Sequence, residues 1–386
     1  MTERPTLAEV VTILDRLYDP RWAADWDAVG TVCGDPDAVI GKVMFAVDPV
    51  AAVAAEAVAW GADLLVTHHP LLLRPVHGVP ATTPKGRIVH VLITHGVALH
   101  TCHTNADSPS GGVSEALARA LGLSAVRPLE PEPAEMLDKL VTFVPTASAE
   151  AVIDALAAAG AGALGDYDRC AFTSTGVGTF RPLPGAAPTI GTMDERSSVA
   201  EIRVEMVLAR PRREEVVAAL RAVHPYEEPA FDVLEMAPLA GDRGSGRIGR
   251  LATPCTLQDF AASVVAALPA AASAVRVAGD PDKHIATVAV CGGAGDFLLD
   301  RVRTSAVDVY VTSDLRHHPV SEFVEHAQPG SSTPALIDVP HWAAESTWLP
   351  VAAERLARAL SKQGTTVEMR ISDTVTDPWS MHLPMS

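Results

Sequence analysis

Histidine and acidic residues recur where predicted strands end, and their types suit a metal ion. The candidates are the pair His68-His69, the segment His103 to Asp107, the pair His317-His318, and His341 with Glu345. If a helix begins near His341, Glu345 lies one turn along on the same face, so both side chains can bind one ion. Imidazoles with carboxylates suit zinc, manganese, iron or nickel, and a carboxylate can bridge two ions. Five such ligands could hold two metals, and a water between the metals would become a nucleophile at neutral pH.

Each of these features also has an ordinary structural explanation. A lone histidine beside a strand is more often a hydrogen-bonded structural residue, which is the favoured interpretation for His103 or His318 taken alone. Adjacent histidines arise by chance in a chain with 14 of them, and His341 with Glu345 could be a helix-surface pair. The glycines in the run Gly292–Gly295 could bind a phosphate or only permit a tight turn. Because polar residues coincide at four separate strand ends, a shared site is favoured over coincidence.

The N-terminal part of the chain alternates helix and strand signals. A capping box, Thr6 to Glu9, precedes a helix with an apolar stripe. Strands are predicted at Lys42–Asp48, Ala62–Thr67 and Val97–His103. Helices are predicted at Pro49–Trp60, near Gly86–His95 and at Gly111–Leu121. This alternation predicts a mostly parallel sheet with helices on both faces.

The pattern changes after Leu123. The prolines Pro128, Pro131 and Pro133 predict a linker, and the glycine-rich stretch Ala240–Gly249 predicts a hinge. Between them the order strand–helix–strand–strand–helix–strand is that of a ferredoxin-like unit. Its segments are Leu140–Val144, Ala149–Ala159, Cys170–Thr179, Val199–Leu208, Arg213–Val223 and Ala230–Glu235. We therefore expect an inserted α+β domain.

The α/β pattern resumes from Arg250. Strands are predicted at Ile285–Cys291, Asp308–Thr312, Pro334–Asp338 and Thr366–Ile371, with a long helix at Ala343–Lys362. The expected domain organisation is a first α/β half over residues 1–127, the insert over 136–238, and a second α/β half over 245–386.

Composition narrows the class of protein. Lys+Arg 30 against Asp+Glu 47 gives a net charge of −17, which argues against nucleic acid and anionic membranes as partners. The 5 cysteines form no CxxC pair, so a reduced, cytoplasmic protein is expected. The first residues lack the apolar core of a signal peptide, and the apolar stretch Phe260–Val275 is too short to span a bilayer.

Several motifs together resemble the NIF-three-like family of dinuclear-metal proteins, often labelled GTP cyclohydrolase I type 2 homologues. They include Trp26-Asp27-Ala28-Val29-Gly30, Thr67-His68-His69-Pro70, His103-Thr104-Asn105-Ala106-Asp107, Gly111-Gly112-Val113, Asp308-Val309-Tyr310-Val311-Thr312, and His341 with Glu345. The segment His224-Pro225-Tyr226-Glu227-Glu228-Pro229-Ala230 is similar to the PII-like insert of the longer members. The resemblance covers essentially the whole chain.

The resemblance implies a fold of two α/β halves with mostly parallel sheets, interrupted by a ferredoxin-like (PII/CutA-like) α+β insert. It implies that the metal ligands are His68, His69, Asp107, His341 and Glu345. Two divalent ions would be bound, zinc being the first choice and manganese, iron or nickel the alternatives, with Asp107 and Glu345 as bridges. It also implies a toroidal homohexamer whose metal sites face an internal cavity.

The leading functional hypothesis is a metal-dependent hydrolase that acts on a small anionic, nucleotide-like substrate. His317 or His103 could carry a proton to the leaving group. Arg74 and Arg316 each lie a few residues from a histidine pair and could hold a phosphate, although either could equally be a surface arginine. The alternative hypothesis is a metal-binding scaffold or regulator without turnover, which a PII-like insert would suit.

Overall fold

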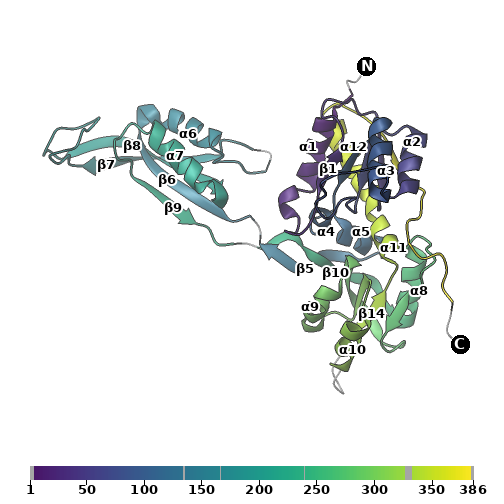
Figure 1. The fold of residues 1–386 in the computed structure, drawn as a ribbon. Coiled ribbons are helices and arrows are strands. Elements are labelled where there is room, and N and C mark those ends of the chain that lie inside the picture. The colour runs from purple at the N-terminus through teal and green to yellow at the C-terminus, as the bar shows by residue number, and fades with distance from the viewer. Residues whose placement is uncertain (1–3, 134, 166, 239, 327–332, 384–386) are drawn as a thin grey trace. The chain divides into compact units, whose positions relative to one another are not determined.

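The structure, a computed structural model, describes residues 4–133, 135–165, 167–238, 240–326 and 333–383 of the 386. The chain divides into two compact units (Figure 1). Unit 1 consists of residues 1–132 and 242–386, and unit 2 consists of residues 133–241. Unit 2 is therefore inserted, in the sequence, between two parts of unit 1.

Unit 1 contains two sheets, and the first has the strand order β1-β4-β3-β2-β15. Its strands are β1 (Gly30–Cys33), β4 (Ala98–Thr101), β3 (Leu64–Thr67), β2 (Lys42–Ala46) and β15 (Glu368–Ile371). All neighbours are parallel except β1 and β4. In this register Thr67 lies beside both Ala46 and Thr101, so the chain leaves three neighbouring strands at one edge of the sheet. That edge carries His68 and His69.

Helices cover both faces of the first sheet, as the sequence pattern predicts. On one face lie α1 (Leu7–Leu17), which begins at the Thr6 capping box, and α12 (Trp348–Lys362), packed on Phe45 and Val66. On the other face α2 (Ala51–Trp60) and α3 (Pro84–Thr94) pack on Met44 and Leu65. Consecutive strand residues point to opposite faces, which explains why an unbroken apolar run feeds two separate cores.

The second sheet of unit 1 has the strand order β11-β14-β13-β12-β10-β5. Its strands are β11 (Arg276–Ala278), β14 (Ala335–Asp338), β13 (Val309–Ser313), β12 (His284–Ala294), β10 (Ala240–Thr256) and β5 (Ser124–Pro133). Strands β12, β13 and β14 are parallel, whereas β10 runs antiparallel to β12 and β11 runs antiparallel to β14. This sheet is thus mixed around a parallel centre.

Two sequence-based predictions about this region are wrong. The proline-rich linker is the strand β5, and the glycine-rich hinge Ala240–Gly249 is the first part of β10. Strand β5 lies at the edge of its sheet, where one side of the backbone needs no partner. Proline lacks an N–H and is tolerated at such an edge. The turn residues therefore mark an edge strand in this case.

Helix α5 (Val113–Ala120) packs against both sheets. Its Val113 and Ala116 belong to the core of the first sheet, and its Leu117 and Ala118 belong to the core of the second. The same second-sheet core contains α8 (Leu257–Ala267), while α9 (Leu299–Thr304) and α10 (His317–Glu325) cover the opposite face. The ends of the two parallel strand groups are thereby held close together.

The predicted helix Ala343–Lys362 is divided into α11 (His341–Ser346) and α12. Pro350 lies in the first turn of α12 and has no N–H to donate to the carbonyl of Ser346. A proline is tolerated in the first turn of a helix but interrupts the ladder that precedes it. The break gives the chain a short helix that carries His341 and Glu345.

Unit 2 has the predicted strand–helix–strand–strand–helix–strand order. Its elements are β6 (Leu137–Pro145), α6 (Ala149–Ala158), β7 (Ala171–Phe180), β8 (Ser197–Ala209), α7 (Arg213–Val223) and β9 (Phe231–Glu235). The antiparallel strand order β7-β8-β6-β9 is that of a ferredoxin-like fold. Helices α6 and α7 cover one face of this sheet (Figure 1). Leu140, Val204 and Met206 lie in the core between the helices and the sheet.

Short helical segments complete the description. They are η1 (Pro20–Trp22), α4 (Thr104–Asp107), η2 (Thr146–Ser148), η3 (Arg210–Arg212) and η4 (Asp296–Leu298). Within the part of the chain that the structure describes, no helix combines the length and the apolar character needed to cross a bilayer.

Candidate metal centre

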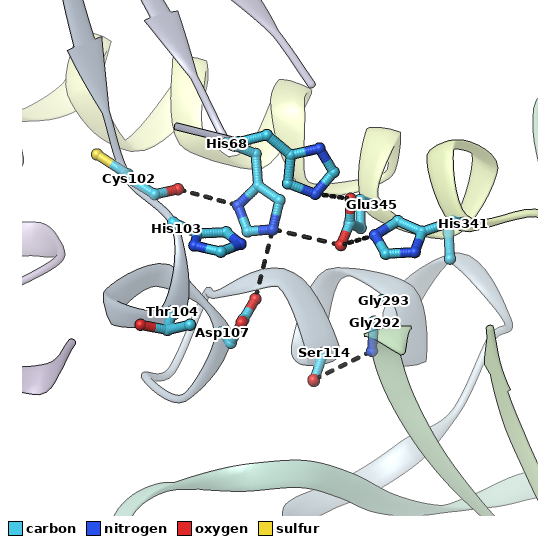
Figure 2. Close-up of polar contacts among 12 residues, drawn as sticks. His68, Cys102, His103, Thr104, Asp107, Ser114, Gly292, Gly293, His341 and Glu345 are labelled. Carbon is cyan, nitrogen blue, oxygen red and sulfur yellow. Dashed lines mark hydrogen bonds and ion pairs between the residues drawn. The ribbon is translucent and has the colours of Figure 1, made fainter. Parts of the chain in front are cut away.

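His68 and His69 follow β3 directly, and each ring is oriented through its Nδ1 atom. His68 Nδ1 donates to the carbonyl oxygen of Cys102 at 2.9 Å (Figure 2). His69 Nδ1 lies 2.7 Å from Asp48 Oδ1. Because a carbonyl oxygen only accepts, the Nδ1 atom of His68 carries a proton, and the Nε2 atom is left as the metal-binding position. Cys102 follows β4 and Asp48 lies just beyond β2, so neighbouring strands of one sheet orient both rings.

His341 and Glu345 are presented by α11. His341 Nδ1 lies 2.7 Å from Asp314 Oδ2, and Asp314 follows β13 of the second sheet. The Glu345 side chain is only 4% exposed and lies between the imidazoles of the two halves of unit 1 (Figure 2). His341 and Glu345 lie one turn apart on this short helix, which the break before Pro350 separates from α12.

Three imidazole Nε2 atoms converge on the carboxylate of Glu345. Glu345 Oε1 lies 2.8 Å from His341 Nε2 and 3.4 Å from His68 Nε2, and Oε2 lies 3.0 Å from His69 Nε2. Asp107, at the end of α4, places Oδ1 3.6 Å from His68 Nε2. The structure therefore brings together all five side chains that the resemblance implies as ligands.

His103 is a further neighbour of the cluster. Its Nδ1 atom lies 2.7 Å from Asp27 Oδ1, and its ring centroid is 5.2 Å from that of His68 and 5.5 Å from that of His69. The potential ligand atoms of His68, His69 and His103 all lie within 4.8 Å of one another, and the same holds for His69, His341 and Glu345. His103 is close enough to exchange a proton with a group bound at the cluster.

The carboxylates of the cluster favour the positively charged form of the neighbouring histidines. Burial acts to lower the pKa of His69, but Glu345 and Asp48 outweigh it and raise the pKa to about 11. Burial is likewise outweighed at His341, where Asp314 and Glu345 raise the pKa to about 10. Burial alone would raise the pKa of Glu345, and the neighbouring His69 and His68 instead lower it. The site is therefore built to contain cations among anionic oxygens.

The donor set fits divalent metal ions. His68, His69 and His341 each have Nδ1 engaged, so each Nε2 faces a carboxylate oxygen, and either a proton on Nε2 or a metal ion must lie between the two atoms; a divalent ion replaces that proton. Within the described ranges, the buried atoms His341 Nε2 and Glu345 Oε2 form no well-directed hydrogen bond. Gly293 leaves room for the cluster, because a Cβ added there would lie 2.6 Å from Glu345 Oε1. Gly293 has a φ of +69°, a conformation that favours glycine and that suits a tight turn. The tight turn was one of the two explanations that the sequence offered for the glycine run, the other being a phosphate site.

A cavity of about 640 Å³ opens beside the cluster. It is lined by His69, His103, Asp107, Gly293, His341 and Glu345, by the aromatic residues Trp22, Trp26 and Phe297, and by Arg21 and Arg243 among others. Trp26 and Phe297 are largely exposed, at 63% and 64%. Arg243 pairs with Glu132, and its guanidinium lies 5.4 Å from the ring centroid of Trp22. The cavity thus combines apolar rings with charged groups next to the candidate metal ligands.

Three residues singled out from the sequence lie away from this cavity. His317 lines a separate cavity of about 320 Å³ together with Arg316, and its ring stacks edge-on against His318. Arg316 pairs with Asp296, with 2.5 Å between Nη2 and Oδ2. Arg74 lies in an exposed loop, and it is not among the residues that line the cavity at the cluster. Of the two histidines considered as proton carriers, His103 is the one beside the candidate ligands.

The sequence reasoning did not identify the acidic residues that orient the rings. Asp27, Asp48 and Asp314 each contact the Nδ1 atom of a histidine in the cluster. Asp48 is the last residue of the predicted strand Lys42–Asp48, and Asp314 lies just beyond the predicted strand Asp308–Thr312. Strand ends are also the position that drew attention to the histidines. That shared position was a usable signal, because metal-binding histidines usually donate their second ring nitrogen to a carboxylate or carbonyl.

Known proteins resemble this chain in both sequence and fold. A relative from Mycobacterium tuberculosis named "GTP cyclohydrolase 1 type 2 homolog" is 50% identical over 376 residues, which cover 97% of each chain. A solved Bacillus cereus protein related to NIF3 superposes with a TM-score of 0.78 at 31% identity and covers 98% of this chain and 100% of its own. A solved Staphylococcus aureus protein superposes with a TM-score of 0.81 at 26% identity and covers 99% and 100%.

The family match extends over nearly the whole chain, including unit 2. The model of Duf34/NIF3 (NGG1p interacting factor 3) matches residues 5–378, a range that contains every residue of the histidine and carboxylate cluster. This chain belongs to the Duf34/NIF3 family.

Proposed function

We propose that this protein is a metal-dependent hydrolase that holds two divalent cations at His68, His69, Asp107, His341 and Glu345. The observation that carries the proposal is the convergence of three Nε2 atoms on one buried carboxylate, with each Nδ1 atom held in place. Both oxygens of Glu345 lie within 3.4 Å of imidazole Nε2 atoms, which suits a carboxylate that bridges two ions. Zinc is the first choice, because imidazole and carboxylate ligands suit it and it needs no redox partner.

Bound cations would supply a water nucleophile at neutral pH and stabilise negative charge that develops on the substrate. The chain's own residues would do the rest. Asp48, Asp314 and the Cys102 carbonyl fix the ring orientations, so little reorganisation is needed when the charge develops. His103, held at Nδ1 by Asp27, would move a proton at Nε2 to or from the leaving group.

The cavity beside the cluster supports a small anionic substrate with a flat ring. Trp26 and Phe297 offer exposed aromatic surface at this cavity. Arg21 and Arg243 also line it but are paired with Asp19 and Glu132, so the bound cations would supply most of the positive charge that attracts an anion. Arg74 and Arg316 are less well placed for this role, because neither lines the cavity. The printed name of the relatives is consistent with a nucleotide-like substrate, although the lining residues do not by themselves specify guanine.

The resemblance also implies a homohexamer, and the cysteine content favours the cytoplasm. The five cysteines are all free in the structure, which suits a reducing compartment. Light scattering on the purified, metal-loaded protein should return about six times the mass of one chain, and a monomeric mass would contradict this part of the proposal.

The decisive experiment incubates zinc-loaded protein with a pool of nucleotides and phosphate esters. A variant carrying His68→Ala and Glu345→Ala is run in parallel, with His95→Ala as a matched control, because His95 is an exposed histidine on another surface. We expect the intact protein and the control to consume a pool member and the double variant to consume none. If metal is bound but nothing is consumed across a broad pool, the protein is a metal-binding scaffold rather than a hydrolase.

A further inference from the structure

Unit 2 contains a cavity of its own, of about 610 Å³. It lies on the sheet face that α6 and α7 leave uncovered, since Phe143, Glu201 and Arg203 alternate with residues of the unit 2 core such as Val204 and Ile202. Strand pairing places Ser174 and Gly176 of β7 beside Arg203 and Glu201 on this face. A volume of this size suits a small-molecule ligand.

The segment after β7 forms part of the cavity wall. Pro182, Ala186, Pro188, Thr189 and Ile190 of this segment line the cavity. Two hydrogen bonds tie the segment to the turn at 225–227. Ala187 N donates to Glu227 Oε2 at 2.8 Å, and Thr189 Oγ1 donates to the Pro225 carbonyl at 2.6 Å. The wall is therefore fixed by the fold of unit 2.

A buried carboxylate lies among aromatic rings in this cavity. Glu201 is only 8% exposed, and its Oε1 accepts from the Tyr226 hydroxyl at 2.8 Å. Tyr226 is held in turn, because its backbone N–H donates to His224 Nδ1 and its ring lies 5.8 Å from that of Phe180. The second oxygen, Oε2, lies over Gly178, where an added Cβ would come within 2.0 Å of it. Among the described residues, no hydrogen-bond donor is placed on this second oxygen.

The charges around the cavity favour a cation. Glu201, Glu227 and Glu228 line it against one basic residue, Arg203. Arg203 shares Glu205, which lies outside the cavity lining, with Lys139, and its guanidinium lies 6.0 Å from the ring centroid of Phe143. The three glutamates still outnumber this one basic residue. Aromatic rings stabilise organic cations through their negative faces, and the rings of Phe180 and Tyr226 line this cavity.

We propose that this cavity binds a small organic ammonium or amidinium compound. Its cationic end would donate to Glu201 Oε2 between the aromatic rings, and its apolar body would lie against Val177 and Ile190. A transition metal ion fits less well, because the described lining residues offer no imidazole or thiolate. A hydrated magnesium or calcium ion could use the glutamates but would gain nothing from the apolar wall. A neutral apolar molecule would displace solvent from the second oxygen of Glu201 without offering it a donor.

The test uses the full chain with labelled valine and isoleucine methyl groups and three probes of one shape. The probes are phenethylammonium, the neutral 2-phenylethanol and the anionic phenylacetate. We expect phenethylammonium to shift the Val177 and Ile190 methyl signals in a saturable way, with affinity about tenfold or more above that of the alcohol. Phenylacetate should leave these signals unchanged.

Matched variants assign the effect to Glu201. Glu201→Gln keeps the shape and removes the charge, and it should weaken phenethylammonium binding by about tenfold or more. Glu214→Gln removes the same charge from the exposed surface of α7 and should leave binding unchanged. Gly178→Ala provides a second route, because it displaces the carboxylate without altering its charge. Equal binding of alcohol and amine, or unchanged binding in a folded Glu201→Gln variant, would overturn the proposal.

Discussion

Asp48 Oδ1 lies 2.7 Å from His69 Nδ1, while the other ring nitrogen of His69 lies 3.0 Å from Glu345 Oε2. Asp48 comes from the end of β2 and Glu345 from α11, so one imidazole connects the first sheet to the C-terminal part of unit 1. Thr376 also donates to Asp48, through its hydroxyl to Oδ2. The orientation of His69 is thus set by a residue that would not itself touch a metal.

Substitution of Asp48 should therefore weaken metal binding without removing a ligand. We expect Asp48→Asn to lower zinc affinity by about tenfold to a hundredfold, the usual effect of losing an orienting carboxylate. Competition with a chromophoric chelator measures this change. Asp37→Asn, at an exposed aspartate of the N-terminal part, should bind zinc as the unaltered chain does. An unchanged zinc affinity in Asp48→Asn would mean that the ring is oriented by other contacts.

His103 should affect turnover more than metal content. We expect His103→Asn to lower kcat about a hundredfold or more while bound zinc is retained, because the ring would move a proton and Asp27 would hold it. Elemental analysis together with steady-state kinetics on the substrate found in the pool experiment separates these effects, and His95→Asn serves as the control. Loss of one metal ion from His103→Asn would make His103 a ligand instead. The same substitution at His317, which lines a separate cavity, tests the other sequence-derived candidate.

Arg247 should position the loop that follows Asp107. It is 1% exposed, and its guanidinium donates to the carbonyls of Gly244, Gly246, Ser108 and Pro109. A lysine ammonium cannot donate to all four carbonyls as the planar guanidinium does. Arg247→Lys should therefore lower the free energy of unfolding by roughly 2–4 kcal/mol and reduce zinc occupancy. Denaturant unfolding followed by tryptophan fluorescence reports on unit 1, which holds all six tryptophans. Arg303→Lys, at a surface pair with Asp300, should change neither quantity.

The stability of unit 2 should depend on pH through the buried carboxylate of Asp138. Asp138 accepts from Arg213 Nε at 2.7 Å and Arg210 Nε at 3.0 Å, and its side chain is fully buried. The bond from Arg213, with that from Arg210, lowers the pKa of Asp138. Since the folded pKa lies below the unfolded value of about 3.9, the stabilisation is complete above that value and is lost as the pH falls through the folded pKa.

Asp138→Asn should therefore destabilise unit 2 by roughly 1.5–3 kcal/mol at pH 7, and this difference should shrink below about pH 4. Hydrogen exchange of peptides from β6 and β8 in the full chain measures the local free energy. Asp232→Asn, on the exposed side of β9, is the matched control. A difference that stays constant down to the lowest pH at which the chain folds would contradict the role given to the carboxylate.

Much of the fold follows from local patterns in the sequence. The alternation of apolar runs and capped helices in unit 1, and the strand–helix order of unit 2, are set by side-chain periodicity and capping, which act over a few residues. Such signals identified the strand that precedes His68 and the helix at Arg213–Val223. They could not show that β15 returns to the first sheet, because strand pairing depends on contacts between distant parts of the chain.

Turn-forming residues gave the weakest guidance. Pro128 and the glycines near Gly244 predicted a linker and a hinge, whereas both stretches are strands of the second sheet. A proline excludes a ladder hydrogen bond on one side only, so whether it ends a strand depends on whether that side faces a neighbour. Whether that side faces a neighbouring strand is decided only when the sheet has assembled.

The sequence by itself determined which side chains of unit 1 are able to bind a metal, because imidazole and carboxylate groups follow the ends of its parallel strands. Only the tertiary structure decided which of them meet. His68 is far in the sequence from His341 and Glu345, and the three converge because α5 packs against both sheets. His317 carries an equally suitable imidazole, yet α10 begins beside a different cavity. Chemical type is a property of each residue, whereas a binding site requires the packing of whole elements to fix distances between residues.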